Sequence, residues 1–244
     1  MLLEKEMKLA DVIHHDYNLV PIINRFGIML GFGDDSIEAI CKKEQINIDF
    51  FLTILNAFHD PQYLDNDYLQ SFSASLLIDY LQKTHRYYLQ NKIPEIEGLI
   101  KEMKSEFELD NVSYNLLQKF FIEYKNELIN HIENEENRVY PYVIDLENAG
   151  HGHPISATLI SRIKKYPIHS YEAEHEDVEE KLTDLKNIII KYLPPSKSQR
   201  IRFRLLKELT VLEKDLNDHA RIEDLILVPK VEILENLVIS KQHL

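Results

Sequence analysis

Hydrophobic residues recur at helical spacing only in short stretches over the first 60 residues. Pro21 interrupts the first stretch and the glycine-containing segment 31–35 interrupts the second, because proline and glycine both break helices. Asp35 and Glu38 resemble a capping box at the start of a helix over 37–44. The pattern therefore predicts short helices separated by clear breaks.

A further helix is expected over 49–58, after which residues 59–70 are polar and lose the apolar period, as a linker does. We predict a small helical N-terminal domain over 1–60, a linker over 61–72 and a second domain over 73–244.

Much longer amphipathic patterns fill the second domain. They predict four helices, over 75–103, 116–147, 168–192 and 198–237, with a long connection over 149–167 between the middle two. The first helix contains a proline that we expect to kink it. Because glycine is scarce and alternating patterns are missing, we predict an all-α chain, with an up-down four-helix bundle after the small helical domain.

Polar side chains interrupt the apolar seams of these helices at matching places. At the i, i+3, i+4 spacing, the seam of the second helix is Phe120, Tyr124, Leu128, His131, Glu135, Val139 and Tyr142, and that of the fourth is Leu205, Leu209, Leu212, Leu216, His219, Glu223 and Leu227. Each seam holds one His-x-x-x-Glu unit. A single histidine interrupts each of the other two seams, His85 in the first helix and His175 in the third.

The six polar residues form a duplicated set. His131 follows His85 by 46 residues, and His219 follows His175 by 44. Residues four apart lie on one helix face, so His131 and Glu135 can reach the same point in the bundle. A buried carboxylate without a counter-charge costs several kcal/mol, and no Lys or Arg occupies the seams beside the two glutamates. A metal ion would supply that charge.

Two equivalent half-sites, each with two histidines and one glutamate, indicate two metal ions. Imidazole and carboxylate suit iron, manganese or zinc. The single cysteine, Cys41, excludes a thiolate cluster and an internal disulfide, and we expect it in the core. A lone histidine on an apolar face is more often a hydrogen-bonded core residue, but the matched spacing of the whole set favours ligands.

Net charge restricts the partners. The formal charge of −13 disfavours binding to a nucleic-acid backbone, and we interpret the local basic cluster as a solvated helix face: Lys197, Arg200, Arg202, Arg204 and Lys207. No apolar run approaches the ~18 residues of a membrane span, and the first residues do not read as a secretory leader. We expect a cytoplasmic protein with neither nucleic-acid nor membrane partners.

Four segments resemble a known family. Residues 131–141 (HIENEENRVYP) and 219–229 (HARIEDLILVP) resemble the metal-binding helices of hemerythrin-like proteins, and specifically those of the iron-sulfur cluster repair di-iron family. Residues 80–99 (YLQKTHRYYLQNKIPEIEGL) resemble that family's first helix, and residues 174–185 (EHEDVEEKLTDL) resemble its third. The resemblance implies a hemerythrin-like bundle.

The N-terminal segment also resembles that family's small leading domain, over the stretch 24–49. Where that domain carries paired cysteines followed by glycines, this chain reads Leu30-Gly31-Phe32-Gly33. Any role of those cysteines cannot operate in this chain.

The resemblance implies an oxo-bridged centre of two iron ions, with manganese as the alternative metal. Its ligands would be His85, His131, Glu135, His175, His219 and Glu223. It also implies that Glu127 and Glu174 are acidic residues on the route to the metals, where they would pass protons during catalysis.

The function implied is that of a di-iron protein of nitrosative or oxidative stress, which either reduces nitric oxide or supplies iron for iron-sulfur cluster repair. Its partners would be a small diatomic, nitric oxide or oxygen, and iron-sulfur proteins. The alternative is a non-catalytic sensor or binding protein for oxygen or nitric oxide. A monomer and a homodimer both stay open.

Overall fold

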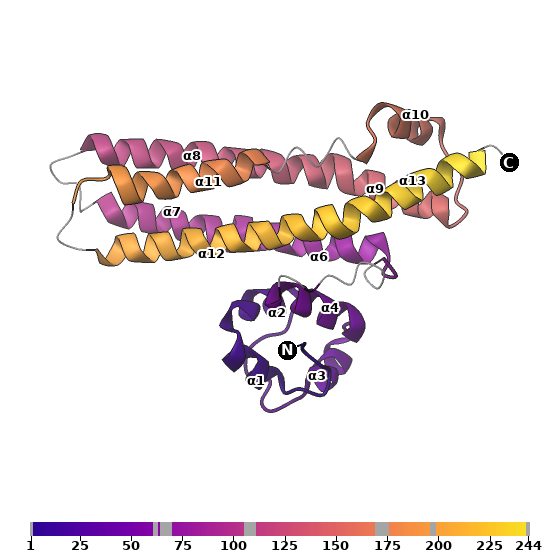
Figure 1. The fold of residues 1–244 in the computed structure, drawn as a ribbon, viewed down its shortest axis with the longest axis horizontal. Coiled ribbons are helices and arrows are strands. Elements are labelled where there is room, and N and C mark those ends of the chain that lie inside the picture. The colour runs from indigo at the N-terminus through magenta and orange to yellow at the C-terminus, as the bar shows by residue number, and fades with distance from the viewer. Residues whose placement is uncertain are drawn as a thin grey trace. The chain divides into compact units, whose positions relative to one another are not determined.

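The computed structural model describes residues 2–60, 63, 70–104, 111–168, 176–195 and 199–242 (Figure 1). The chain divides into two compact units, Met1–Lys83 and Thr84–Leu244. Over the described residues it consists of helices and contains no strand, so the predicted all-α class is confirmed. Most of the predicted linker lies outside the described residues, and the domain limits drawn from the sequence stay a prediction.

The first unit is built from short helices. They are α1 (Leu9–His15), the 3-10 turn η1 (Tyr17–Leu19), α2 (Val20–Arg25), α3 (Ile37–Glu44), α4 (Ile48–His59) and the first part of α6 (Ala74–Tyr87). Aromatic side chains form much of its core: the ring centroids of Phe26 and Phe51 lie 4.8 Å apart, and those of Phe26 and Tyr80 lie 5.3 Å apart. Tyr80 thus ties the start of α6 into this unit.

The predicted capping box at the start of α3 is wrong by one residue. Ser36 is the N-cap, and its side-chain oxygen accepts a hydrogen bond from the Ala39 backbone N–H at 3.2 Å. The Asp35 backbone carbonyl instead accepts a bond from the Leu9 N–H at 3.2 Å. The extended backbone of Ser36 allows its short side chain to reach the third helical residue, which is the usual geometry of an N-cap.

The long helices of the second unit continue through short π-helical turns. Their order is α6, η2 (Tyr88–Lys92) and α7 (Ile93–Glu102); α8 (Asn111–Asn134), η4 (Glu135–Val139) and α9 (Tyr140–Gly150); α11 (Glu176–Asn187) and η7 (Ile188–Tyr192); and α12 (Arg200–Ile222), η8 (Glu223–Leu227) and α13 (Val228–Gln242). Successive long helices run in opposite directions (Figure 1), as predicted for an up-down bundle.

Prolines explain three of these π turns. Pro94, Pro141 and Pro229 are the second residues of α7, α9 and α13, each directly after a π turn. Proline donates no backbone hydrogen bond, and its ring clashes with the carbonyl four residues earlier. A π turn avoids the clash by pairing the N–H of one residue with the carbonyl five residues earlier. The kink expected at Pro94 is therefore a widened turn within a continuous helix.

The bundle closes around one core. Helix α7 packs against α8 and α12, and α11 packs against the same two helices. All seam residues predicted for α12 and η8 are buried. In α8 the predicted seam is wrong at Phe120, which is 36% exposed, whereas Leu117 and Phe121 are buried in its place.

The predicted long connection contains a helix that was not predicted from the sequence, α10 (Ala157–Lys165). Ser156 caps it through a hydrogen bond from the Leu159 N–H at 3.1 Å, and three of its apolar side chains are buried. Farther along, the buried carboxylate of Glu235 accepts hydrogen bonds from Tyr142 Oη at 2.5 Å and from the Ile168 N–H at 3.2 Å. Glu235 therefore fixes the end of the connection to the bundle.

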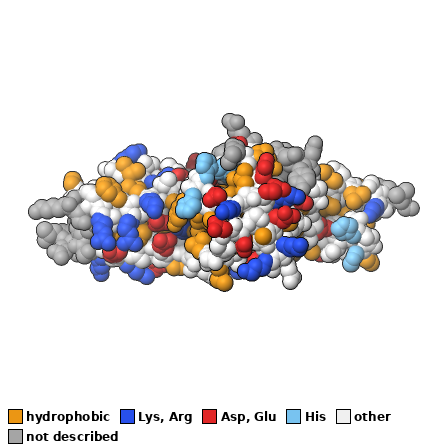
Figure 2. Space-filling view, turned by 90° about the horizontal axis from the view of Figure 1, so that it is seen from below, with side chains coloured by type: hydrophobic (Ala, Val, Ile, Leu, Met, Phe, Trp, Pro, Cys, Tyr) orange, Lys and Arg blue, Asp and Glu red, His pale blue; other side chains and the backbone are white. Residues whose placement is uncertain are grey.

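Charged side chains of both signs stand next to one another on the face drawn in Figure 2. In the basic cluster of α12, the Arg204 guanidinium pairs with Glu102 at 3.6 Å, and Arg202 is buried and donates to the Pro194 carbonyl at 2.7 Å. Arg202 thus helps to hold the start of α12, which is a structural role; Lys197 lies outside the described residues. None of the helices formed by the described residues is long and apolar enough to span a bilayer.

Candidate metal centre

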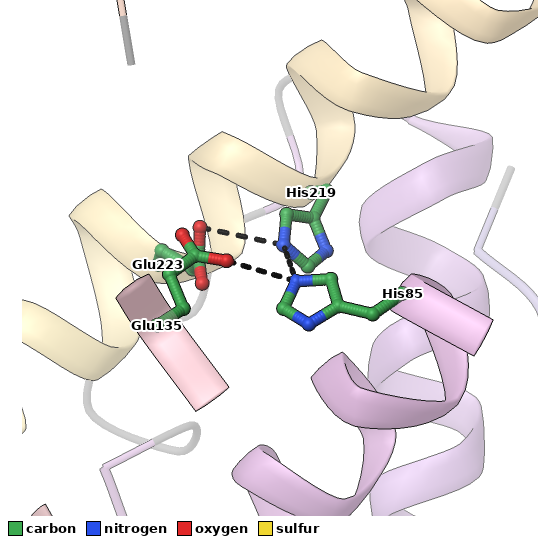
Figure 3. Close-up of side chains that lie close together, drawn as sticks. All are labelled: His85, Glu135, His219 and Glu223. Atoms are coloured by element: carbon green, nitrogen blue, oxygen red, sulfur yellow. Dashed lines mark hydrogen bonds and ion pairs between the residues drawn. The ribbon is translucent and has the colours of Figure 1, made fainter. Parts of the chain in front are cut away.

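Four buried side chains from three continuous helices converge in the bundle (Figure 3), and α12 and η8 belong to one of these helices. His85 lies in α6, Glu135 begins η4, His219 lies in α12 and Glu223 begins η8. One ligand atom from each lies within 4.8 Å of the others, and none of the four residues is more than 4% exposed. All four residues were predicted as ligands from the apolar seams, and the fold brings them together.

The two imidazoles and the two carboxylates face one another directly. His85 Nε2 lies 2.9 Å from Glu135 Oε2 and 3.3 Å from His219 Nε2, and His219 Nε2 lies 3.4 Å from Glu223 Oε2. Donors on opposite sides of one transition-metal ion are up to ~4.4 Å apart, because metal–N and metal–O bonds are ~2.0 to 2.2 Å. The spacing and the donor types therefore fit a bound metal ion.

Glu135 stands between two histidines. Its Oε1 lies 2.9 Å from His131 Nε2, and its Oε2 lies 2.9 Å from His85 Nε2. His131 is one turn before Glu135 and its side chain is 12% exposed, which places it at the edge of the cluster. A carboxylate whose two oxygens face different imidazoles can hold two ions, one on each oxygen.

A second acid orients His85 from the opposite side of its ring. Glu136 Oε1 lies 2.9 Å from His85 Nδ1, so the ring can donate there while Nε2 faces the cluster. Burial of the ring lowers the pKa of His85, but hydrogen bonds to Glu135 and Glu136 outweigh this and raise that pKa to about 9. Without metal, a proton on His85 provides the positive charge that the carboxylates require. Glu136 does not lie on a predicted apolar seam, so helical periodicity did not predict it at the site.

Tyr140 contacts two members of the cluster. Helical periodicity did not predict this residue at the site either. Its hydroxyl donates to Glu223 Oε1 at 2.8 Å and lies 3.5 Å from His85 Nε2. The Tyr140 and His85 rings are nearly parallel, with an interplanar angle of 8° and centroids 5.6 Å apart. The proline that follows Tyr140 was the available signal, because it favours a turn that changes the helix phase.

The other predicted site residues are placed as follows. Glu127 lies in α8, one turn before His131, and its Oε1 pairs with Lys181 Nζ. His175 and Glu174 lie outside the described residues. Cys41 is fully buried, as expected for a core residue, and burial raises the pKa of its thiol to about 11.

Comparisons with known proteins support a metal-binding bundle. Residues 77–231 match the family described as "Hemerythrin HHE cation binding domain". The chain is also similar to the iron-sulfur cluster repair protein ScdA of Staphylococcus haemolyticus, with 19% identity over 235 residues, which cover 94% of this chain and 99% of that protein. The matched family range contains every residue of the four-residue cluster.

Proposed function

This chain belongs to the hemerythrin family, and on that premise we propose that it is a non-haem protein that binds two iron ions and acts in nitrosative or oxidative stress. Its activity would be the reduction of nitric oxide or the supply of iron for iron-sulfur cluster repair. The full-length similarity to a protein named for iron-sulfur cluster repair supports this direction.

The observation that carries the proposal is the position of Glu135 between His131 and His85, each 2.9 Å from a different carboxylate oxygen. One ion would be held by His85, His219 and one oxygen from each of Glu135 and Glu223. The second would be held on the His131 side of Glu135, where the sequence pattern also predicts His175 as a ligand. Nitrogen and carboxylate donors suit iron or manganese.

Iron would supply redox chemistry and positions for a small diatomic ligand. The side chains of this protein perform the remaining tasks. Glu136 fixes the ring of His85, and the buried helix faces around the cluster exclude bulk water. Glu127 is proposed from the sequence to pass a proton; its Oε1 pairs with Lys181, so Oε2 is the oxygen that would carry the proton. Glu174 is proposed for the same task from the sequence alone.

Metal content and spectroscopy test the centre. The protein purified from iron-replete cells should contain two metal ions per chain by elemental analysis and show a ferric absorption band in the near-ultraviolet and visible range. Glu135→Gln should lose metal, because the amide oxygen is a poorer ligand than the carboxylate. Glu133→Gln is the matched control, since Glu133 lies on the same helix and is exposed. Fewer than one metal per chain in the wild-type protein would contradict the proposal.

Turnover is tested separately, by anaerobic consumption of nitric oxide in the presence of a reductant. An enzyme consumes nitric oxide continuously, and a protein that supplies iron instead restores activity to a damaged iron-sulfur protein. Binding of nitric oxide that stops at a fixed number of molecules per chain, without any iron transfer, would refute both activities and assign the protein to sensing or storage.

A further inference from the structure

A surface pocket of about 630 Å³ is lined by residues of η4 and α10. Figure 1 shows α10 beside α9, the helix that continues from η4. Pockets of ~300 to 1,000 Å³ have the size that holds a small-molecule ligand. The polar lining consists of two guanidiniums, one ammonium, two hydroxyls and one amide: Arg138, Arg162, Lys165, Thr158, Ser161 and Asn137. No Asp or Glu is among the described residues that line the pocket.

One face of α10 supplies most of this lining. Its members follow the spacing i, i+3, i+4, i+7, which places them on the same side of a helix: Thr158, Ser161, Arg162 and Lys165. The apolar residues of α10 are buried on the side that packs against the rest of the unit: Leu159, Ile160 and Ile163. Because these apolar residues fix the rotation of α10, its hydroxyls and cations stay directed to the pocket.

The guanidinium of Arg162 is held in place by two contacts. Its Cζ lies 4.4 Å from the centroid of the Tyr142 ring, and one of its N–H groups donates to the backbone carbonyl of Arg138. The Tyr142 hydroxyl in turn donates to Glu235. A guanidinium has five N–H donors, so several stay available to a ligand. Binding to a side chain that is already ordered costs less entropy than binding to a mobile one.

The cations of the pocket have no carboxylate partner in the part of the chain that the structure describes. The Arg138 side chain donates to the amide oxygen of Asn134 at 2.8 Å, which leaves its charge uncompensated. Lys165 is exposed and forms no ion pair with a described residue. The pocket therefore gathers positive charge that a bound anion would neutralise.

Repulsion between the two arginines supports this view. Burial lowers the pKa of Arg162, Tyr142 and Asp145 oppose that effect, and the neighbouring charge of Arg138 lowers the pKa further. Asp145 lies in α9 and does not line the pocket. An anion placed between the two guanidiniums would replace this repulsion with attraction to both.

A purely structural explanation covers only part of the pattern. Basic residues in the last turn of a helix offset its dipole, which accounts for three residues of α10: Arg162, Lys164 and Lys165. It does not account for Arg138, which comes from η4. The chain carries a net charge of −13, so its surface as a whole repels a long nucleic-acid backbone. A local basic pocket on such a surface suits a small anion.

We propose that this pocket binds a small phosphorylated molecule of the mononucleotide class, whose phosphate is held by Arg138, Arg162 and Lys165. Arginine presents a planar fork of donors that matches the oxygens of a phosphate. Tyr166 also lines the pocket and is 64% exposed, so its ring offers a flat surface for a base. None of the lining residues is a predicted metal ligand, so the inference does not depend on the metal centre.

Isothermal titration calorimetry of the purified full-length protein with AMP tests the proposal, and adenosine serves as the ligand without a phosphate. The variants are Lys165→Gln and Arg138→Gln, each of which removes one charge from the pocket. Lys164→Gln is the matched control, because Lys164 is exposed on the same helix and does not line the pocket. The melting temperature of each variant checks that it is folded.

The wild-type protein and Lys164→Gln should bind AMP with equal affinity and should bind adenosine more weakly. Lys165→Gln and Arg138→Gln should each weaken AMP binding by ~5-fold, the effect of losing one exposed ion pair, and added salt should weaken the binding to the wild-type protein. The inference would be overturned by equal affinity for AMP and adenosine, by unchanged AMP binding in both pocket variants, or by no binding of AMP at millimolar concentration.

Discussion

The charge balance around His85 predicts a loss of stability in the metal-free protein as the pH rises. The ordinary pKa of histidine is about 6.5 and the pKa of His85 in the folded protein is about 9, so between these pH values the folded protein holds a proton that the unfolded chain releases. The resulting stabilisation is fully present below pH 6.5 and is lost as the pH rises through about 9. At 1.36 kcal/mol per pKa unit, it amounts to about 3 kcal/mol.

Urea unfolding of the chelator-treated protein at several pH values between 6 and 10 measures this loss. His85→Asn should be less stable at low pH and should lose the excess pH dependence, because it has no imidazole to titrate. His153→Asn is the control, since His153 is exposed, and it should keep the wild-type profile. Changes in overall charge with pH affect all three proteins alike, so the comparison isolates His85. Equal profiles for the wild-type protein and His85→Asn would refute the reasoning.

Three further predictions concern the metal, the core and the thiol. Removal of metal by a chelator should lower the melting temperature of the wild-type protein, because a ligand at 100 times its Kd stabilises the folded state by about 2.7 kcal/mol. The melting temperature of Glu135→Gln should be nearly the same with and without chelator. Leu209→Ala should lower the free energy of unfolding in urea by ~2 to 5 kcal/mol, because Leu209 is fully buried. Phe203→Ala should change it by under ~0.5 kcal/mol, because Phe203 is 65% exposed. Equal effects of the two substitutions would contradict the packing described. The Cys41 thiol should resist a thiol reagent at pH 8 until urea is added, since it is buried and its pKa is about 11; rapid reaction of the folded protein would count against that burial.

Helical periodicity was sufficient to predict the members of the cluster. The apolar seams are interrupted by four residues of the cluster: His85, Glu135, His219 and Glu223. Since each seam faces the common core, polar residues on different seams also point into that core. Their role as ligands remains a proposal, but their convergence follows from burial alone. Phe120 shows the limit of the method: Phe120 and Phe121 both fit the spacing from Tyr124, and only the packed structure shows that Phe121 is buried.

Tyr140 and Glu136 could not be predicted in the same way, because a periodicity of 3.6 assumes a regular α-helix. Glu136 follows Glu135 directly and would point about 100° away from it, and Tyr140 would point about 140° away. The π turn changes the phase between these positions, so that both residues reach the cluster. Proline at position 141 is visible in the sequence, but a kink, a break and a π turn are all compatible with it.

The π turns also determine where the long helices can tolerate a change in length. A π turn is an α-helix that holds one additional residue, so the deletion of a single codon within 135–139 would let the helix close into regular α geometry. Residues after the deletion would keep their phase, because the wider turn had absorbed the additional residue, and Tyr142 would still face Glu235. The same deletion in a regular stretch of α8 would instead turn everything after it by about 100° relative to the site. Substitutions at the exposed positions of this segment, such as Asn137, would leave the phase intact. In a library of variants, single-residue deletions in η4 and η8 should therefore be less damaging than single-residue deletions in the regular turns of α8 and α12.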